Sequence, residues 1–170
     1  IVSGSNVSDM VNLKAVSTAG NVDVSVSGGS YNKSPLAGNV NLLALKGKGE
    51  ASLKATGNIT QSGTDLTVKA DRINLSSAHG TLGTASQAII LEGGQTAMGQ
   101  DRLAASVNAS AQGNIYLTQN SGNMRIGTIV SDSGDVALTA TGGDFVDALP
   151  VASNIPNSSV DATIQNWMDM

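Results

Sequence analysis

Apolar and polar residues alternate one by one through much of the chain. Val22, Val24 and Val26 are separated by Asp23 and Ser25. The same alternation recurs at Leu66, Val68 and Ala70, at Ile73 and Leu75, and at Val136, Leu138 and Ala140. Because successive side chains of a β-strand point to opposite faces, this pattern predicts strands with one buried face rather than helices.

A short unit precedes many of these runs: a glycine, then Asn or Asp, then an apolar residue. The unit begins at Gly20, Gly38, Gly57, Gly113, Gly122, Gly134 and Gly143. Successive spacings are 18 and 19 residues in the first half, and both Gly113 to Gly134 and Gly122 to Gly143 span 21 residues. Fixed periods of this length are typical of solenoids, and the two interleaved series indicate more than one strand in each repeat.

The glycines of this unit are interpreted as turn residues that supply a positive φ, which the following Asn tolerates. Of the three prolines, two lie after residue 149. A proline inside a sheet removes a backbone donor, so this distribution favours a continuous sheet before residue 149.

The sequence therefore predicts an all-β domain over residues 1–148, a parallel β-helix (solenoid) of about seven coils. Loops are expected near residues 28–36 and 92–102, where the alternation stops. An antiparallel sandwich would also contain short strands with glycine turns, but a sandwich has no fixed period.

Residues 149–170 form a predicted linker followed by a short C-terminal helix. Ser158 and Asp161 have the spacing of a helix N-terminus. The apolar residues Val160, Ile164, Trp167 and Met168 then fall on one helical face. Such a helix would cover the open end of the solenoid, or it would bind a partner through Trp167.

Composition narrows the function classes. Apolar residues make up 40% of the 170 residues, aromatics 2% and charged residues 13%, with no cysteine. No apolar run is long enough for a membrane-spanning helix, and no cysteine can bind a metal. With a net charge of −4 and few aromatics, nucleic-acid binding is not expected. The chain begins at Ile1 without a signal-peptide pattern, so we expect it to be a fragment of a longer protein. We also expect this fragment to be monomeric.

Residues suited to catalysis are sparse, and no cofactor site is expected. The only histidine, His79, is interpreted as a surface turn residue. Asp132, Asp135, Asp144 and Asp147 form an acidic cluster in the sequence. Their expected role is turn formation, and calcium binding remains an open alternative.

Binding, if local, is predicted on the two loops, because binding residues tend to lie on loops held by a rigid scaffold. The candidate residues are Tyr31 and Lys33 in one loop, and Glu92 and Arg102 in the other. A lysine-rich first half could also form a weak patch for anionic glycans.

Residues 110 to 148 carry a resemblance to a known family. The segments Gly113-Asn-Ile-Tyr-Leu-Thr and Gly134-Asp-Val-Ala-Leu-Thr-Ala-Thr-Gly, followed by Asp144-Phe-Val-Asp-Ala, resemble the filamentous haemagglutinin-like adhesins. Within that group they look most like the leukotoxin-type filamentous adhesins of bacteria. The match is looser over residues 10 to 77.

This resemblance implies a right-handed parallel β-helix that an outer-membrane partner secretes to the bacterial surface. It implies a non-enzymatic rod that presents binding surfaces to host cells or to a glycan receptor, and it brings no catalytic residues. The rod of a cytotoxin is one alternative. A glycan-active β-helix enzyme, which would need acids or bases converging in a groove, is the other.

Overall fold

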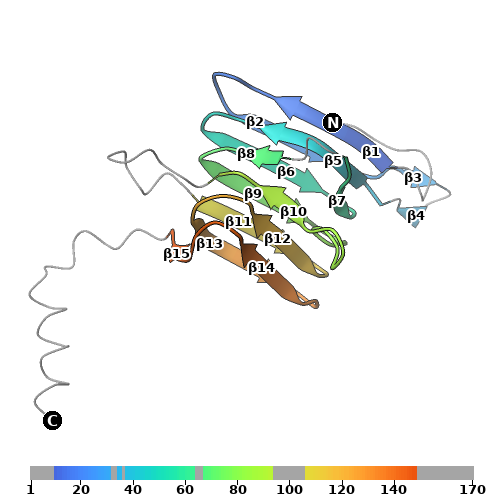
Figure 1. Cartoon of the computed structure of the whole chain (residues 1–170). Coiled ribbons are helices and arrows are strands. Elements are labelled where there is room, and N and C mark those ends of the chain that lie inside the picture. Colours follow the sequence, from blue (N-terminus) through green and yellow to red (C-terminus); the bar gives the residue numbers. More distant parts are fainter. Residues whose placement is uncertain (1–9, 32–33, 36, 64–66, 94–105, 149–170) are drawn as a thin grey trace, which may run out of the picture.

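The computed structural model describes residues 10–31, 34–35, 37–63, 67–93 and 106–148 (Figure 1). Within these ranges every regular element is a β-strand, and no helix is present. The predicted all-β class is therefore confirmed. The predicted linker and C-terminal helix over 149–170 lie outside the described residues.

Almost all of the strands belong to two parallel sheets. The seven-stranded sheet contains β1 (Met10–Val16), β5 (Asn39–Lys46), β7 (Ile59–Gln61), β8 (Thr67–Lys69), β10 (Ile89–Leu91), β12 (Ile115–Gln119) and β14 (Val136–Ala140). The six-stranded sheet contains β2 (Val22–Val26), β6 (Glu50–Ala55), β9 (Arg72–Ser77), β11 (Ser106–Ala111), β13 (Met124–Ser131) and β15 (Phe145–Asp147).

The chain moves back and forth between these sheets. In the seven-stranded sheet the order is β1-β5-β8-β10-β12-β14, with β7 also paired to β5, and in the other sheet the order is β2-β6-β9-β11-β13-β15. Every pairing inside both sheets is parallel. We call one passage through both sheets a level, so the described residues form six levels, one fewer than the predicted coils.

The advance per level is less regular than the glycine spacing predicts. Val40 pairs with Ile59 after 19 residues, and Ile115 pairs with Val136 after 21. Ile73, however, pairs with Val107 after 34 residues. Insertions after β2 and after β10 lengthen two of the levels. The spacing of 18 from Gly20 to Gly38 does not describe a repeat, because Gly20 precedes a six-stranded-sheet strand and Gly38 precedes a seven-stranded-sheet strand.

The core lies between the two sheets. Its largest fully buried side chains are Leu42, Leu45, Leu53, Ile59, Ile73, Leu75, Leu82, Ile89, Leu91, Ile115, Leu117 and Met124. These are mostly aliphatic and stack in columns, for example Leu53 beside Leu75 and Ile115 beside Leu82. A column repeats one side-chain position at each level, so branched aliphatic residues fill it without large rings.

The sheet ends depart from the predicted inward pattern. Val136 pairs with the fully buried Ile115, yet Val136 is 45% exposed because β14 is an edge strand. Phe145 on β15 is 50% exposed for the same reason. At the other end, Val24 on the edge strand β2 is half-buried and packs against the core.

Asparagine side chains join successive levels at the turns. The Oδ1 atoms of Asn39 and Asn58 accept hydrogen bonds from the backbone N–H groups of Asn58 and Thr81, both at 2.9 Å. Asn21, Asn114 and Asn123 make the same kind of bond at turns, to Glu50, Asp135 and Asp144 respectively. Asn108 makes it inside the sheet, from β11 to Thr128 on β13.

Each of these bonds needs a glycine on the next level. A Cβ atom on Gly49 would lie 2.7 Å from Asn21 Oδ1, and one on Gly143 would lie 2.6 Å from Asn123 Oδ1. Among the described glycines, only Gly63, Gly83 and Gly122 have a positive φ. The positive-φ interpretation is therefore wrong for the repeated glycines other than Gly122. Close packing accounts for these glycines instead, except at Gly20, where a Cβ atom would meet nothing closer than Ser17 Oγ at 3.6 Å.

Part of the predicted loop at 28–36 is regular. β3 (Ser30–Tyr31) and β4 (Ser34–Pro35) form a small antiparallel pair between β2 and β5. Lys33 lies outside the described residues. In the second predicted loop only Glu92 and Gly93 are described.

Candidate functional site

A groove runs across the turns that follow the seven-stranded sheet. β5, β8, β10 and β12 all end at this edge, where the chain turns toward the six-stranded sheet. Lys46 pairs with Lys69, and Leu91 pairs with both Val68 and Gln119. This register places Lys46, Lys69 and Glu92 in one column and the small residues Gly47, Ala70 and Gly93 in the next.

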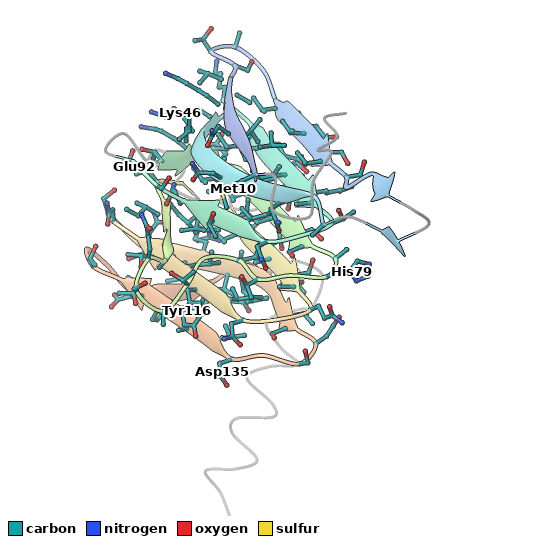
Figure 2. All side chains as sticks on the ribbon, turned by 90° about the vertical axis from the view of Figure 1, so that its right-hand side faces the viewer. Met10, Lys46, His79, Glu92, Tyr116 and Asp135 are labelled. Carbon is teal, nitrogen blue, oxygen red and sulfur yellow. The ribbon has the colours of Figure 1, made fainter. Side chains whose placement is uncertain are left out.

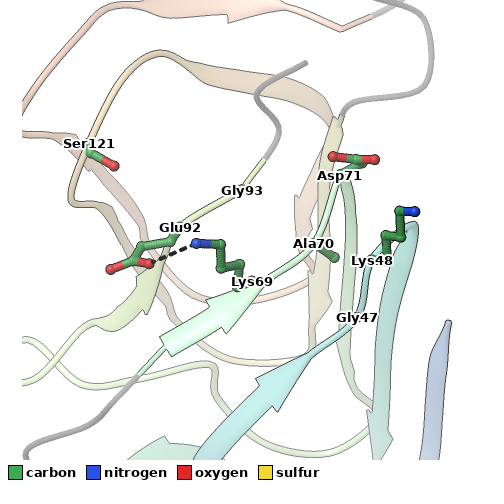
Figure 3. A pocket seen from close by; sticks show the side chains of 8 residues that line it. All are labelled: Gly47, Lys48, Lys69, Ala70, Asp71, Glu92, Gly93 and Ser121. Carbon is green, nitrogen blue, oxygen red and sulfur yellow. Dashed lines mark ion pairs between the residues drawn. The ribbon is translucent and has the colours of Figure 1, made fainter. Parts of the chain in front are cut away.

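The groove has a volume of about 380 Å³ and is lined by Gly47, Lys48, Lys69, Ala70, Asp71, Glu92, Gly93 and Ser121. Figure 3 shows its arrangement: Lys69 and Glu92 stand on one side, Lys48 and Asp71 on the other, and the small residues lie between them. The floor is closely packed, because a Cβ atom on Gly93 would lie 2.6 Å from Ile73 Cδ1. The volume of the groove is within the range of small-ligand sites.

The charges in the groove are mixed. Lys69 Nζ lies 3.7 Å from Glu92 Oε2, and the two side chains are 63% and 40% exposed. An ion pair this exposed stabilises the fold little and is screened by salt. Lys46 and Lys69 are neighbours on adjacent strands, and like charges in this position repel. The lysine pair Lys46 and Lys69 therefore favours a negative charge nearby. Glu92 supplies that charge beside Lys69.

A buried glutamine supports the groove from below. Gln119 is fully buried, and its Nε2 donates to the carbonyl oxygens of Gly93 at 3.0 Å and Ser121 at 2.8 Å. Sequence reasoning missed this residue. The signal was its inward position in the alternating run of Ile115, Leu117 and Gln119, where a polar residue must find buried partners.

The structure separates the predicted binding residues. Glu92 lines the groove, whereas Tyr31 lies in β3, at the turns that lead into the seven-stranded sheet, on the opposite side of Figure 1. Lys33 and Arg102 lie outside the described residues. Lys48 and Lys69 were predicted only as members of a weak basic patch, and Asp71 was not predicted as a site residue. Their convergence depends on the register between levels.

The other candidate residues are not gathered. His79 is exposed beside Gly80, at the turn where its N–H donates to the Thr56 carbonyl (Figure 2). Asp135 and Asp144 lie at turns before β14 and β15, and their N–H groups donate to asparagine oxygens. Within the described ranges, no three His, Cys, Asp or Glu side chains are close enough to hold a metal ion.

The outer face of the six-stranded sheet is a polar surface. Asn108 Nδ2 donates to Asn74 Oδ1 at 2.9 Å, and Asn74 Nδ2 donates to Glu50 Oε1 at 2.7 Å. A second, shallower hollow of about 230 Å³ lies on this face, between Lys54 and Thr128. The amide groups of Asn74 and Asn108 and the hydroxyls of Ser76 and Ser110 are already hydrogen-bonded there, which leaves the groove as the stronger candidate site.

No protein-family model matches the chain, and comparison with curated proteins and with solved structures gives no match. In the part of the chain that the structure describes, no helix has the length and hydropathy needed to span a bilayer.

Proposed function

We propose that the chain is a segment of a right-handed parallel β-helix, and that it acts as the structural and adhesive rod of a secreted filamentous bacterial adhesin. The observation that carries this proposal is the stacking of six levels through both sheets in chain order. Backbone pairing and the asparagine bonds at the turns continue from level to level. Such a stack is rigid and holds surface residues at fixed heights.

The proposed mechanism is mechanical. The rod presents its turn residues and its groove to a host cell or glycan receptor, and the resemblance of residues 110 to 148 to filamentous adhesins supports this role. By the same resemblance, the parent protein would leave the cell through an outer-membrane partner. A rod of this kind in a cytotoxin would present the same surfaces.

Cell binding tests the proposal. Beads coated with the 170-residue chain are expected to adhere to cultured mammalian cells. Beads coated with a Leu53→Asp variant, which buries a charge at a fully buried position, should lose that adhesion. Equal adhesion of both bead types, or none above an albumin coat, would contradict an adhesive rod.

The groove also favours a second candidate, a glycan-active β-helix enzyme. Two acids and two lysines line it: Asp71, Glu92, Lys48 and Lys69. Paired acids and bases are what glycan cleavage requires. However, Lys69 and Glu92 are widely exposed, whereas electrostatic catalysis is strongest where water is excluded. Release of new reducing or unsaturated ends from acidic polysaccharides, abolished by Glu92→Gln, would establish the enzyme instead.

A further inference from the structure

The groove has a direction, because its charges change from level to level. Lys48 and the neighbouring Lys46 supply positive charge at the level of β5. The level of β8 carries both Lys69 and Asp71, and the level of β10 carries Glu92. From level to level, the charged lining residues therefore change from a lysine at β5, through a lysine and an aspartate at β8, to a glutamate at β10.

The groove also has the shape for a linear ligand. Its floor of Gly47, Ala70 and Gly93 contributes one small residue from each of three successive levels. Neighbouring strands are about 4.8 Å apart, so the floor extends roughly 10 Å along the stack. A chain of sugar rings lying along this direction would meet Lys48 at the first level, Lys69 and Asp71 on opposite walls at the second, and Glu92 at the third.

The mixture of side chains selects a class of ligand. Lysine ammonium groups donate hydrogen bonds and attract carboxylates, whereas Asp71 and Glu92 accept hydrogen bonds from hydroxyl groups. A polysulfated chain carries more negative charge and fewer free hydroxyls, so the two carboxylates would repel it. A sugar with one carboxylate and several hydroxyls satisfies both kinds of side chain.

We propose that this groove binds a linear glycan of carboxylated sugars, such as a uronic acid oligomer. Lys48 and Lys69 hold its carboxylates, and Asp71 and Glu92 accept its hydroxyl groups and discriminate against sulfated chains. The inference rests on the proposed adhesive function and names the ligand class for one surface of the rod.

Binding of oligogalacturonate to the 170-residue chain, measured by calorimetry, tests this assignment. We expect saturable binding that the double variant Lys48→Ala/Lys69→Ala weakens about tenfold, because each exposed charge contributes a factor of roughly three to five. Lys54→Ala is the matched control: it removes a lysine from the outer face of the six-stranded sheet and should leave the affinity unchanged. A neutral galactan oligomer should bind more weakly than the uronate.

The two acids provide a separate readout. The double variant Asp71→Asn/Glu92→Gln keeps hydroxyl acceptors but removes both negative charges, so it should bind a heparin oligomer several-fold more tightly than the unmodified chain does. Uronate affinity should change much less. Stronger binding of heparin than of uronate by the unmodified chain, or an equal loss with Lys54→Ala, would overturn the assignment.

These results remain distinguishable from those on cell adhesion. Adhesion of coated beads without uronate binding would reject this ligand and leave the adhesive rod in place. Uronate binding accompanied by cleavage would support the groove as the binding site. It would also favour the glycan-active enzyme over the adhesive rod.

Discussion

The contact between Asn21 and Gly49 offers a test of why glycine recurs at the turns. Asn21 Oδ1 accepts a hydrogen bond from the Glu50 N–H at 2.9 Å. A Cβ atom on Gly49 would lie 2.7 Å from that oxygen and 3.9 Å from Asn21 Cγ, with no other heavy atom outside its chain neighbours within 4 Å. Gly49→Ala therefore collides with one side chain alone.

The size of the effect follows from this geometry. In Gly49→Ala, the Asn21 side chain must rotate away and lose its hydrogen bond, which costs about 1 kcal/mol. Asn21→Ala loses the same bond at a similar cost, and water reaches the exposed Glu50 N–H. The double variant loses that bond only once. An alanine at position 49 also restricts the unfolded chain by about 0.4–1 kcal/mol in favour of folding. This gain applies equally to Gly49→Ala alone, so it cancels when the variants are compared. The double variant is thus expected to cost about 1 kcal/mol less than the sum of the two single costs, because that sum counts the one lost hydrogen bond twice.

Urea unfolding followed by far-ultraviolet circular dichroism gives the four free energies of this cycle. Gly20→Ala is the control, because the nearest atom to its Cβ would be Ser17 Oγ at 3.6 Å. This variant should not destabilise the fold, and its more restricted unfolded chain should raise the free energy of unfolding by up to about 1 kcal/mol. At Gly134 the Cβ would also meet backbone atoms of Gly113 and Asn114, so Asn114→Ala should not rescue Gly134→Ala. Additive costs at Asn21 and Gly49, within about 0.5 kcal/mol, would refute the close-packing explanation.

Two other substitutions probe the core and the groove. Leu53→Ala is expected to lower the free energy of unfolding by about 2–5 kcal/mol, because Leu53 is fully buried between β2 and β9. Val24→Ala on the edge strand β2 should cost clearly less in the same urea titration, and an equal cost would show that β2 is not an edge. Glu92→Gln should change the unfolding free energy by less than about 0.5 kcal/mol, since its partner Lys69 is 63% exposed. A larger change would show that this ion pair supports the fold.

The strands could be predicted from the sequence because alternation is a local property. Val22, Val24 and Val26 do face the core, with Asp23 and Ser25 exposed between them. The number of levels could not be predicted from the glycine spacing. Gly20 and Gly38 belong to different turns of one level, and only the strand pairing shows which glycines are equivalent.

The groove was beyond prediction for a related reason. Lys48, Lys69 and Glu92 are more than 20 residues apart from one to the next, and they meet only because β5, β8 and β10 are in register. The advance is 23 residues both from Lys46 to Lys69 and from Val68 to Leu91, a value that the glycine spacings of 18, 19 and 21 residues do not give. Glu92 directly follows β10, but nothing in the local sequence identifies its neighbours on the other levels.

The distribution of the asparagine bonds explains why the groove lies where it does. At the turns that lead into the seven-stranded sheet, Asn39 and Asn58 connect three successive levels. These turns therefore need an asparagine on one level and a glycine facing it on the next. At the opposite turns, Asn21 makes such a bond at the first level, and the groove begins after it, at Gly47. Across residues 47–48, 69–71 and 92–93, the levels are joined by backbone bonds instead, such as that from the Gly47 N–H to the Lys69 carbonyl. These backbone bonds use no side-chain atoms, and charged side chains can therefore stand beside the small floor residues without weakening the stack.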